Sequence, residues 1–182
     1  MLTIKDAGTV EAALLPVAEL AAQMRLADEY DAVPGQAERL AGRLRAAMGM
    51  VERKLGQILV ERDLILSGPG PDGRRIVVPL APIAMLGGVE VVRPGDRRPL
   101  DGSWLEYEGR DVVLVVPETV PASARLDVVV TAGFGFWNDV PDELRQAVLL
   151  TAEALDEGRE ELLPLANQLM AGHRDLRIGG RV

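Results

Sequence analysis

The chain has no cysteine and a single histidine among its 182 residues. Without cysteine it can form neither a disulfide nor a thiolate metal site, which fits a reducing compartment. Aromatic residues make up only 3%, so we expect a core of leucine, valine, isoleucine and alanine. No run of about 18 uncharged apolar residues predicts a membrane span. Residues Met1–Asp6 also lack the basic-then-apolar order of a signal peptide, so we expect a protein made and used in soluble form.

The 20 Lys and Arg residues are outnumbered by 28 Asp and Glu residues, so the formal net charge is −8. Such a chain repels nucleic acid unless it has a local basic patch. The arginines of residues 37–59 are interleaved with Glu38 and Glu52, which indicates a solvated or subunit-facing surface. A DNA-binding regulator that uses Arg43 and Arg45 remains an alternative.

Three regions differ in their periodicity. Residues 37–59 carry apolar side chains at steps of three and four, which predicts a long helix after a shorter one at about Pro16–Leu26. Pro141 opens another helix, which is apolar on nearly all sides and must therefore be buried, and a last short helix begins near Pro164. The middle is rich in valine and isoleucine between turn residues. It predicts strands at Asp63–Ser67, Arg75–Val78, Val89–Arg93, Trp104–Glu108, Val112–Val116 and Arg125–Thr131.

The predicted fold class is α+β and mainly helical: a helical bundle core with an inserted antiparallel β-rich excursion. Short turns between successive strands favour antiparallel pairing, because parallel strands need long crossovers. We expect one domain over residues 1–182, with helices at about 14–62 and 141–173, the β insertion at about 63–134 and a C-terminal tail at 174–182. The linkers look too short to demand a separate β domain.

Residues that could carry catalysis or bind a metal are few. His173 has no carboxylate partner at helical spacing, so it predicts a surface or interface histidine and no metal site. The acids of one segment predict a solvated helix end more than acid–base chemistry: Glu153, Asp156, Glu157, Glu160 and Glu161. We therefore expect no catalytic, cofactor-binding or metal-binding residue and no cofactor.

One glycine-rich turn follows a strand and precedes a helix, as phosphate loops do. The segment Ala132–Phe136 lacks the third glycine of a dinucleotide fingerprint and the Lys-Ser/Thr of a P-loop. We expect its glycines to turn the backbone out of the sheet, with Phe134, Phe136 and Trp137 packed over the helices. A small ligand-binding or enzymatic domain that uses the Gly133–Trp137 turn remains a second alternative.

The C-terminal tail carries three arginines and one internal acid in an otherwise acidic chain. Its apolar residues Leu176 and Ile178 alternate as in an extended strand. The tail is either a frayed end or a docking segment that becomes ordered on a partner chain or a neighbouring subunit. The candidate partner-binding residues are Arg174, Leu176, Arg177, Ile178 and Arg181.

Several motifs, taken in order, resemble one family. The segment Val128–Gly135 ends a strand in Ala-Gly-Phe-Gly, and Val140–Leu150 continues as Val-Pro-x-x-Leu-Arg-Gln-Ala. Two earlier helical segments, Pro16–Leu26 and Arg45–Gly56, and the proline-bracketed Val78–Ile83 fit the same order. Over residues 14–178 the chain resembles the head–tail connector (adaptor) proteins of long-tailed phages and of phage-derived gene transfer agents. It departs from them at residues 152–155, where the family often has aromatics.

This resemblance implies a structural virion protein and no enzyme. It implies a ring of roughly a dozen subunits between portal and tail, closed by heterologous contacts. DNA would pass through the central channel without sequence-specific binding, and the C-terminal segment would dock on the portal protein. The other implied partners are tail or stopper proteins. We expect a monomer or weak oligomer in isolation, which assembles in the cytoplasm and ends in the neck of the particle.

Overall fold

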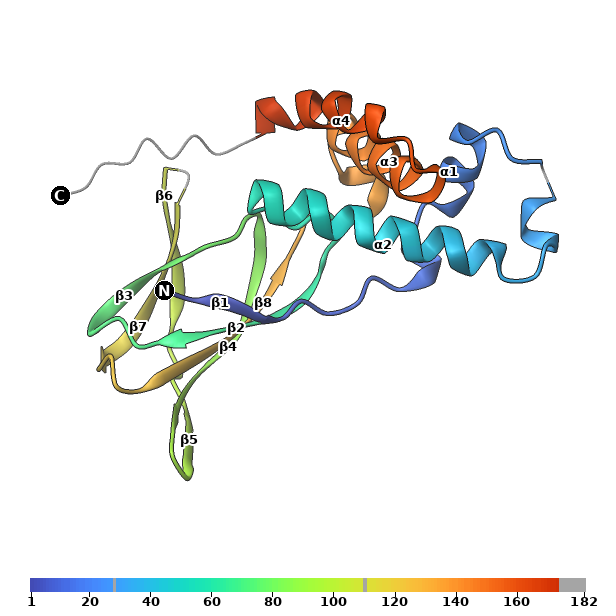
Figure 1. The fold of residues 1–182 in the computed structure, drawn as a ribbon. Coiled ribbons are helices and arrows are strands. Elements are labelled where there is room, and N and C mark those ends of the chain that lie inside the picture. The colour runs from blue at the N-terminus through green and yellow to red at the C-terminus, as the bar shows by residue number, and fades with distance from the viewer. Residues whose placement is uncertain (28, 110, 174–182) are drawn as a thin grey trace. The chain divides into compact units, whose positions relative to one another are not determined.

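The computed structural model describes residues 1–27, 29–109 and 111–173 (Figure 1). The chain divides into two compact units. The β unit comprises residues 1–9 and 60–134, and the helical unit comprises residues 10–59 together with the chain from 135 onward. Helices take 39% of the structure and strands 34%. The predicted class, a mainly helical fold with a helical bundle core, is therefore wrong. The single connector domain over residues 1–182 stays a prediction.

Four α-helices make up most of the helical unit: α1 (Val17–Gln23), α2 (Gln36–Leu55), α3 (Asp142–Glu157) and α4 (Leu163–Met170). Helix α2 ends at Gly56, whose φ of 70° is left-handed and whose N–H donates to the carbonyl of Glu52 at 2.8 Å. Helix α3 packs against both α2 and α4, which is why its side chains are buried on most sides. The predicted burial of this helix is confirmed.

Short 3-10 turns lie before and between these helices and end the described chain. They are η1 (Ala12–Leu14), η2 (Tyr30–Ala32), η3 (Trp137–Asp139), η4 (Glu160–Leu162) and η5 (Ala171–His173). Among the helices of the described ranges, none combines the length and the apolar character needed to cross a membrane.

Eight strands form the β unit of the described chain. They are β1 (Thr3–Asp6), β2 (Arg62–Pro69), β3 (Gly73–Val78), β4 (Ile83–Arg93), β5 (Asp96–Pro99), β6 (Trp104–Glu108), β7 (Asp111–Val120) and β8 (Arg125–Ala132). One sheet has the order β1-β2-β8-β4-β5 and the other the order β3-β7-β6. Every pairing is antiparallel, as the short turns predict.

The core of the five-stranded sheet lies on one face. In the register of the strands, Leu66 lies opposite Val128 and Val128 opposite Val89, and all three are buried. The next row along β8, at Ser67, Asp127 and Glu90, points to the other face. We call this second surface the outer face.

The strand region has its own core, which explains the error in the predicted fold class. Leu64, Leu66, Leu114 and Leu126 are almost fully buried, and the strands belong to a compact unit separate from the helices, so this region is no excursion from a helical core. The sequence-based prediction also missed two strands, β1 and β5. Each has four residues, which is too short for a period of two to stand out.

The two faces of β8 predict different responses to truncation. Leu126 is fully buried, and we expect Leu126→Ala to lower the free energy of unfolding by about 2–5 kcal/mol because it opens a cavity. Val129 lies on the outer face with 40% exposure, and Val129→Ala should cost at most about 1 kcal/mol. Urea denaturation measures both. Equal losses would contradict a core on the Leu126 face.

Candidate functional site

The aromatic residues of the Gly133–Trp137 turn differ in their burial. Trp137 is buried, and its indole N–H donates to both carboxylate oxygens of Glu19 at 3.0 Å. Phe136 is 71% exposed, so the prediction that it packs over the helices is wrong. A hydrogen bond from backbone to side chain closes the turn instead: the Phe136 N–H donates to the carboxylate of Asp139 at 2.8 Å. Gly135 is required there: its φ is 121°, and a Cβ would lie 2.7 Å from that carboxylate.

Two hollows in the described chain lie away from this turn. One, of about 370 Å³, is lined by residues 86–90 of β4 and by 99–103. The other, of about 360 Å³, is lined by Gln23, Met24, Arg25, Glu153, Glu157 and Arg159. Neither includes a residue of the Gly133–Trp137 turn, so neither supports a small-ligand site there.

Three of the four arginines of α2 bind acceptors within the chain. The guanidinium of Arg39 donates to both oxygens of Asp156 at 2.6 Å, and Arg43 Nε lies 3.4 Å from the same carboxylate. Arg45 Nε donates to the carbonyl of Val10 at 3.3 Å. These contacts fix α2 to its neighbours. They take away support from the DNA-binding alternative, which needs Arg43 and Arg45 for phosphates.

The acidic end of α3 is only partly solvated. Glu153 is buried and accepts hydrogen bonds from Gln23 at 2.7 Å and from Arg159 at 2.6 Å. The Asp156 side chain is buried beneath the two arginines of α2. The predicted solvated helix end is therefore wrong for these two acids, because side chains distant in sequence cover them. Glu157, Glu160 and Glu161 are exposed as predicted.

Within the described part of the chain, the histidine has one acidic partner. His173 Nε2 lies 3.6 Å from the carboxylate of Glu143, and its carbonyl accepts a hydrogen bond from Gln57 at 3.1 Å. Within residues 1–27, 29–109 and 111–173, no group of three or more potential ligands could hold a metal ion. The predicted partner-binding residues lie outside the described residues, and their role stays a prediction: Arg174, Leu176, Arg177, Ile178 and Arg181.

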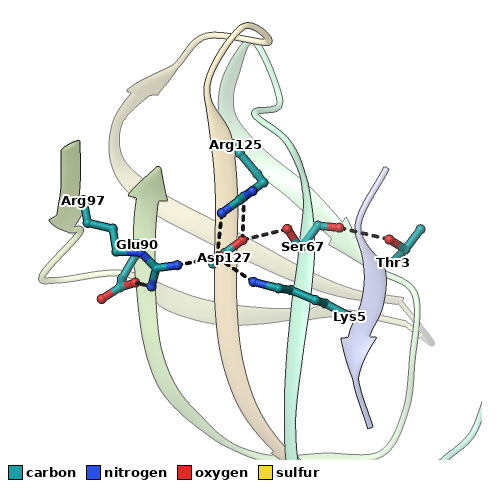
Figure 2. A network of polar contacts seen from close by, with 7 residues as sticks. All are labelled: Thr3, Lys5, Ser67, Glu90, Arg97, Arg125 and Asp127. Carbon is teal, nitrogen blue, oxygen red and sulfur yellow. Dashed lines mark hydrogen bonds and ion pairs between the residues drawn. The ribbon is translucent and has the colours of Figure 1, made fainter. Parts of the chain in front are cut away.

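A polar network lies on the outer face of the β unit, where no sequence motif indicated it (Figure 2). At its centre is Asp127, whose side chain is only 6% exposed. Ser67 Oγ donates to this carboxylate at 2.6 Å, Arg125 Nε at 3.1 Å, Arg97 Nη2 at 3.4 Å and Lys5 Nζ at 3.5 Å. We call the residues drawn in Figure 2 the Asp127 cluster: Thr3, Lys5, Ser67, Glu90, Arg97, Arg125 and Asp127.

The order of the strands in the sheet explains how residues so far apart meet. Strand β8 lies in the middle, and the cluster draws side chains from β1, β2, β4 and β5 around it. Lys5 and Asp127 are 122 positions apart in the chain. The one local indication in the sequence is an aspartate at an outward position of a valine-rich strand, two residues after Arg125.

The electrostatics of the Asp127 cluster keep its central carboxylate charged. Burial alone would raise the pKa of Asp127. The hydrogen bond from Ser67 and the positive charges of Arg125 and Lys5 outweigh burial and hold this pKa below its ordinary value. Asp127 is therefore ionised at neutral pH and accepts bonds from all sides, which makes it a poor general base. The carboxylate of Asp127 holds three cations, Lys5, Arg97 and Arg125, over one face of the sheet.

Comparisons place this fold among particle components. No protein-family model and no curated protein matches the chain. A chain in the neck of an empty gene transfer agent particle, computed with C6 symmetry, is 26% identical with a TM-score of 0.80 and covers 100% of this chain and 98% of that one.

Two further structures agree. A chain of the virion of a native gene transfer agent particle is 25% identical with a TM-score of 0.78, and it covers 100% of this chain and 98% of that one. A chain in the neck of a native particle, computed with C12 symmetry, is 24% identical with a TM-score of 0.73 over 98% of both chains; it shows the shared fold alone.

Replacing the central carboxylate tests the electrostatics. A depressed pKa contributes stability above the unfolded value of about 3.9, and that contribution is lost as pH falls through the folded pKa. We expect Asp127→Asn to lower the free energy of unfolding by about 1–3 kcal/mol at pH 7. The difference should shrink below about pH 4.

Denaturation at several pH values measures this, with Glu90→Gln as the control. Glu90 pairs with Arg97 at 2.8 Å but is partly exposed, so its loss should cost under about 1 kcal/mol. A difference for Asp127→Asn that stays constant with pH would rule out its charge as the cause.

The shared fold extends over the whole chain. The chain is a structural relative of gene transfer agent neck proteins, and the resemblance to head–tail connector proteins that its motifs indicate is confirmed.

Proposed function

We propose that this chain is a structural component of the neck of a phage-like or gene transfer agent particle, where its copies form a ring that joins the portal to the tail. The observation that carries the proposal is the full-length likeness to chains of gene transfer agent necks and virions. A likeness that covers 100% of this chain and 98% of those chains leaves no large part of either without a counterpart.

The symmetry of the related assemblies supports a ring. Those necks were computed with C6 and C12 symmetry, so their chains repeat around an axis. A chain that repeats around an axis contacts its neighbours through two different faces, and the ring closes when the rotation between copies divides a full turn. A ring of about a dozen copies follows if this chain takes the same place.

The channel and the contacts with other proteins complete the proposal. A net charge of −8 suits a passage through which DNA slides without being held. The likeness to structural components of particles supports a role without catalysis. Docking of the basic tail, residues 174–182, on the portal protein belongs to the same proposal, as do contact with tail or stopper proteins and assembly in the cytoplasm before the chain enters the particle.

Deleting the gene in the producing cell tests this function. We expect DNA-filled heads and complete tails to accumulate unjoined, because the connection between them is missing, and negative-stain electron microscopy counts joined and unjoined particles. A plasmid copy of the gene is the control and should restore joining. Joined particles in normal numbers without the gene would refute the proposal.

A further inference from the structure

The outer face of the five-stranded sheet carries an apolar patch beside the Asp127 cluster. Val129 is 40% exposed and follows Asp127 by two positions on β8. Ile65, directly opposite Val129 on β2, is partly exposed. Met85, opposite Thr131 on β4, is 59% exposed. Cations and apolar side chains therefore share one exposed surface.

The cations of the cluster are held in place and yet reach solvent. The side chains of Lys5, Arg97 and Arg125 are each about half exposed, although all three bind Asp127. Within the cluster they face two carboxylates, Asp127 and Glu90, which leaves one positive charge in excess there (Figure 2). The exposed Asp63, opposite Thr131, lies at the other end of the face, beyond the cluster. Since the buried carboxylate already orders these long side chains, they lose less conformational entropy when a partner binds.

The chemistry of this face suits a protein partner better than a nucleic acid. Affinity for DNA comes from cations that neutralise phosphates, and here two carboxylates already neutralise most of the charge. Methionine and arginine are enriched at protein interfaces, and Met85 and Arg97 lie on this face. The edge strands β1 and β5 are short and carry Lys5 and Arg97, which discourages edge pairing and leaves the face for contact.

The same chain carries a surface with the opposite charge. At the end of α3, Glu153, Glu157 and Glu161 surround the single cation Arg159. Glu160 is exposed and has no ion pair within the described part of the chain. Apolar residues follow at once: Leu162 and Leu163 are partly exposed and Leu165 is 48% exposed. The acids of this segment are opposite in charge to the cations of the sheet face, and its leucines could pack against the apolar Val129 and Met85.

We propose that the outer face of the five-stranded sheet is a subunit interface that binds the acidic segment Glu157–Leu165 of a second copy of this chain. The inference rests on the ring proposed above and names the two faces that meet in it. Because the two faces differ, the contact is heterologous, and repetition of it builds a ring instead of a closed pair.

Cross-linking in the particle tests the contact directly. The chain has no cysteine, so Arg97→Cys combined with Glu160→Cys introduces the only two thiols. Particles purified from the producing cell are treated with a short bis-maleimide and separated by denaturing electrophoresis. We expect a ladder of dimers and larger species.

The matched control is Arg98→Cys with Glu160→Cys. Arg98 is the neighbour of Arg97 on β5 with similar exposure, 47% against 56% for the side chains. It lies opposite the buried Val91 in the strand register, so it belongs to the other face. This pair should stay monomeric under the same treatment.

Charge reversal provides a second measurement. Arg97→Glu alone and Glu160→Arg alone should each reduce incorporation of the chain into particles about tenfold. The two changes together should recover part of the incorporation, because opposite charges then face each other again across the proposed contact. Arg98→Glu is the control and should be incorporated normally.

The outcomes separate this inference from the proposed function. Three results in particles that contain the chain would overturn the interface and leave the neck role standing. They are the absence of a ladder, an equal ladder with the Arg98→Cys pair, and cross-links only to another protein. Binding of duplex DNA that is lost in Arg97→Glu would also overturn it, in favour of a nucleic-acid site. Wild-type particles that lack the chain would overturn the proposed function itself.

Discussion

Strand β8 pairs with β2 on one side and β4 on the other, so its alternation sets both faces of the five-stranded sheet. Leu126, Val128 and Val130 point inward and are almost fully buried. Arg125, Asp127 and Val129 point outward and organise the charged and apolar halves of the outer face. A shift of register by one residue would place Asp127 in the core. The proposed interface therefore depends on the pairing that buries the core.

Local patterns were enough to predict most of the elements. The helical periodicity located α2 and α3, and the valine-rich runs located six strands, although β4 begins at Ile83, well before the predicted Val89. The bounds of β6 agree with the prediction at both ends. The separate core of the β unit was not predictable in the same way, because a strand pattern says that one face is buried but not what buries it. The structure shows that the strands form a compact unit of their own.

The Asp127 cluster and the ion pairs of α3 were beyond prediction for a related reason. Lys5 reaches Asp127 only because β1 joins the sheet through β2, and Arg39 reaches Asp156 only because α2 packs on α3. Both depend on tertiary neighbours separated by more than a hundred residues. The full-length resemblance was visible because its motifs are local, whereas contacts between distant residues leave no such local trace.

The path of the chain between the two units has an evolutionary consequence. The polypeptide leaves the β unit after residue 9, returns at 60 and leaves again after 134, so the sheet is encoded in two separate stretches of the gene. A recombination event that exchanged residues 60–134 between relatives would bring in seven strands and retain the resident β1. Its Lys5 would then meet a foreign counterpart of Asp127. Inheritance of the outer face thus links the codons of β1 to those of residues 60–134.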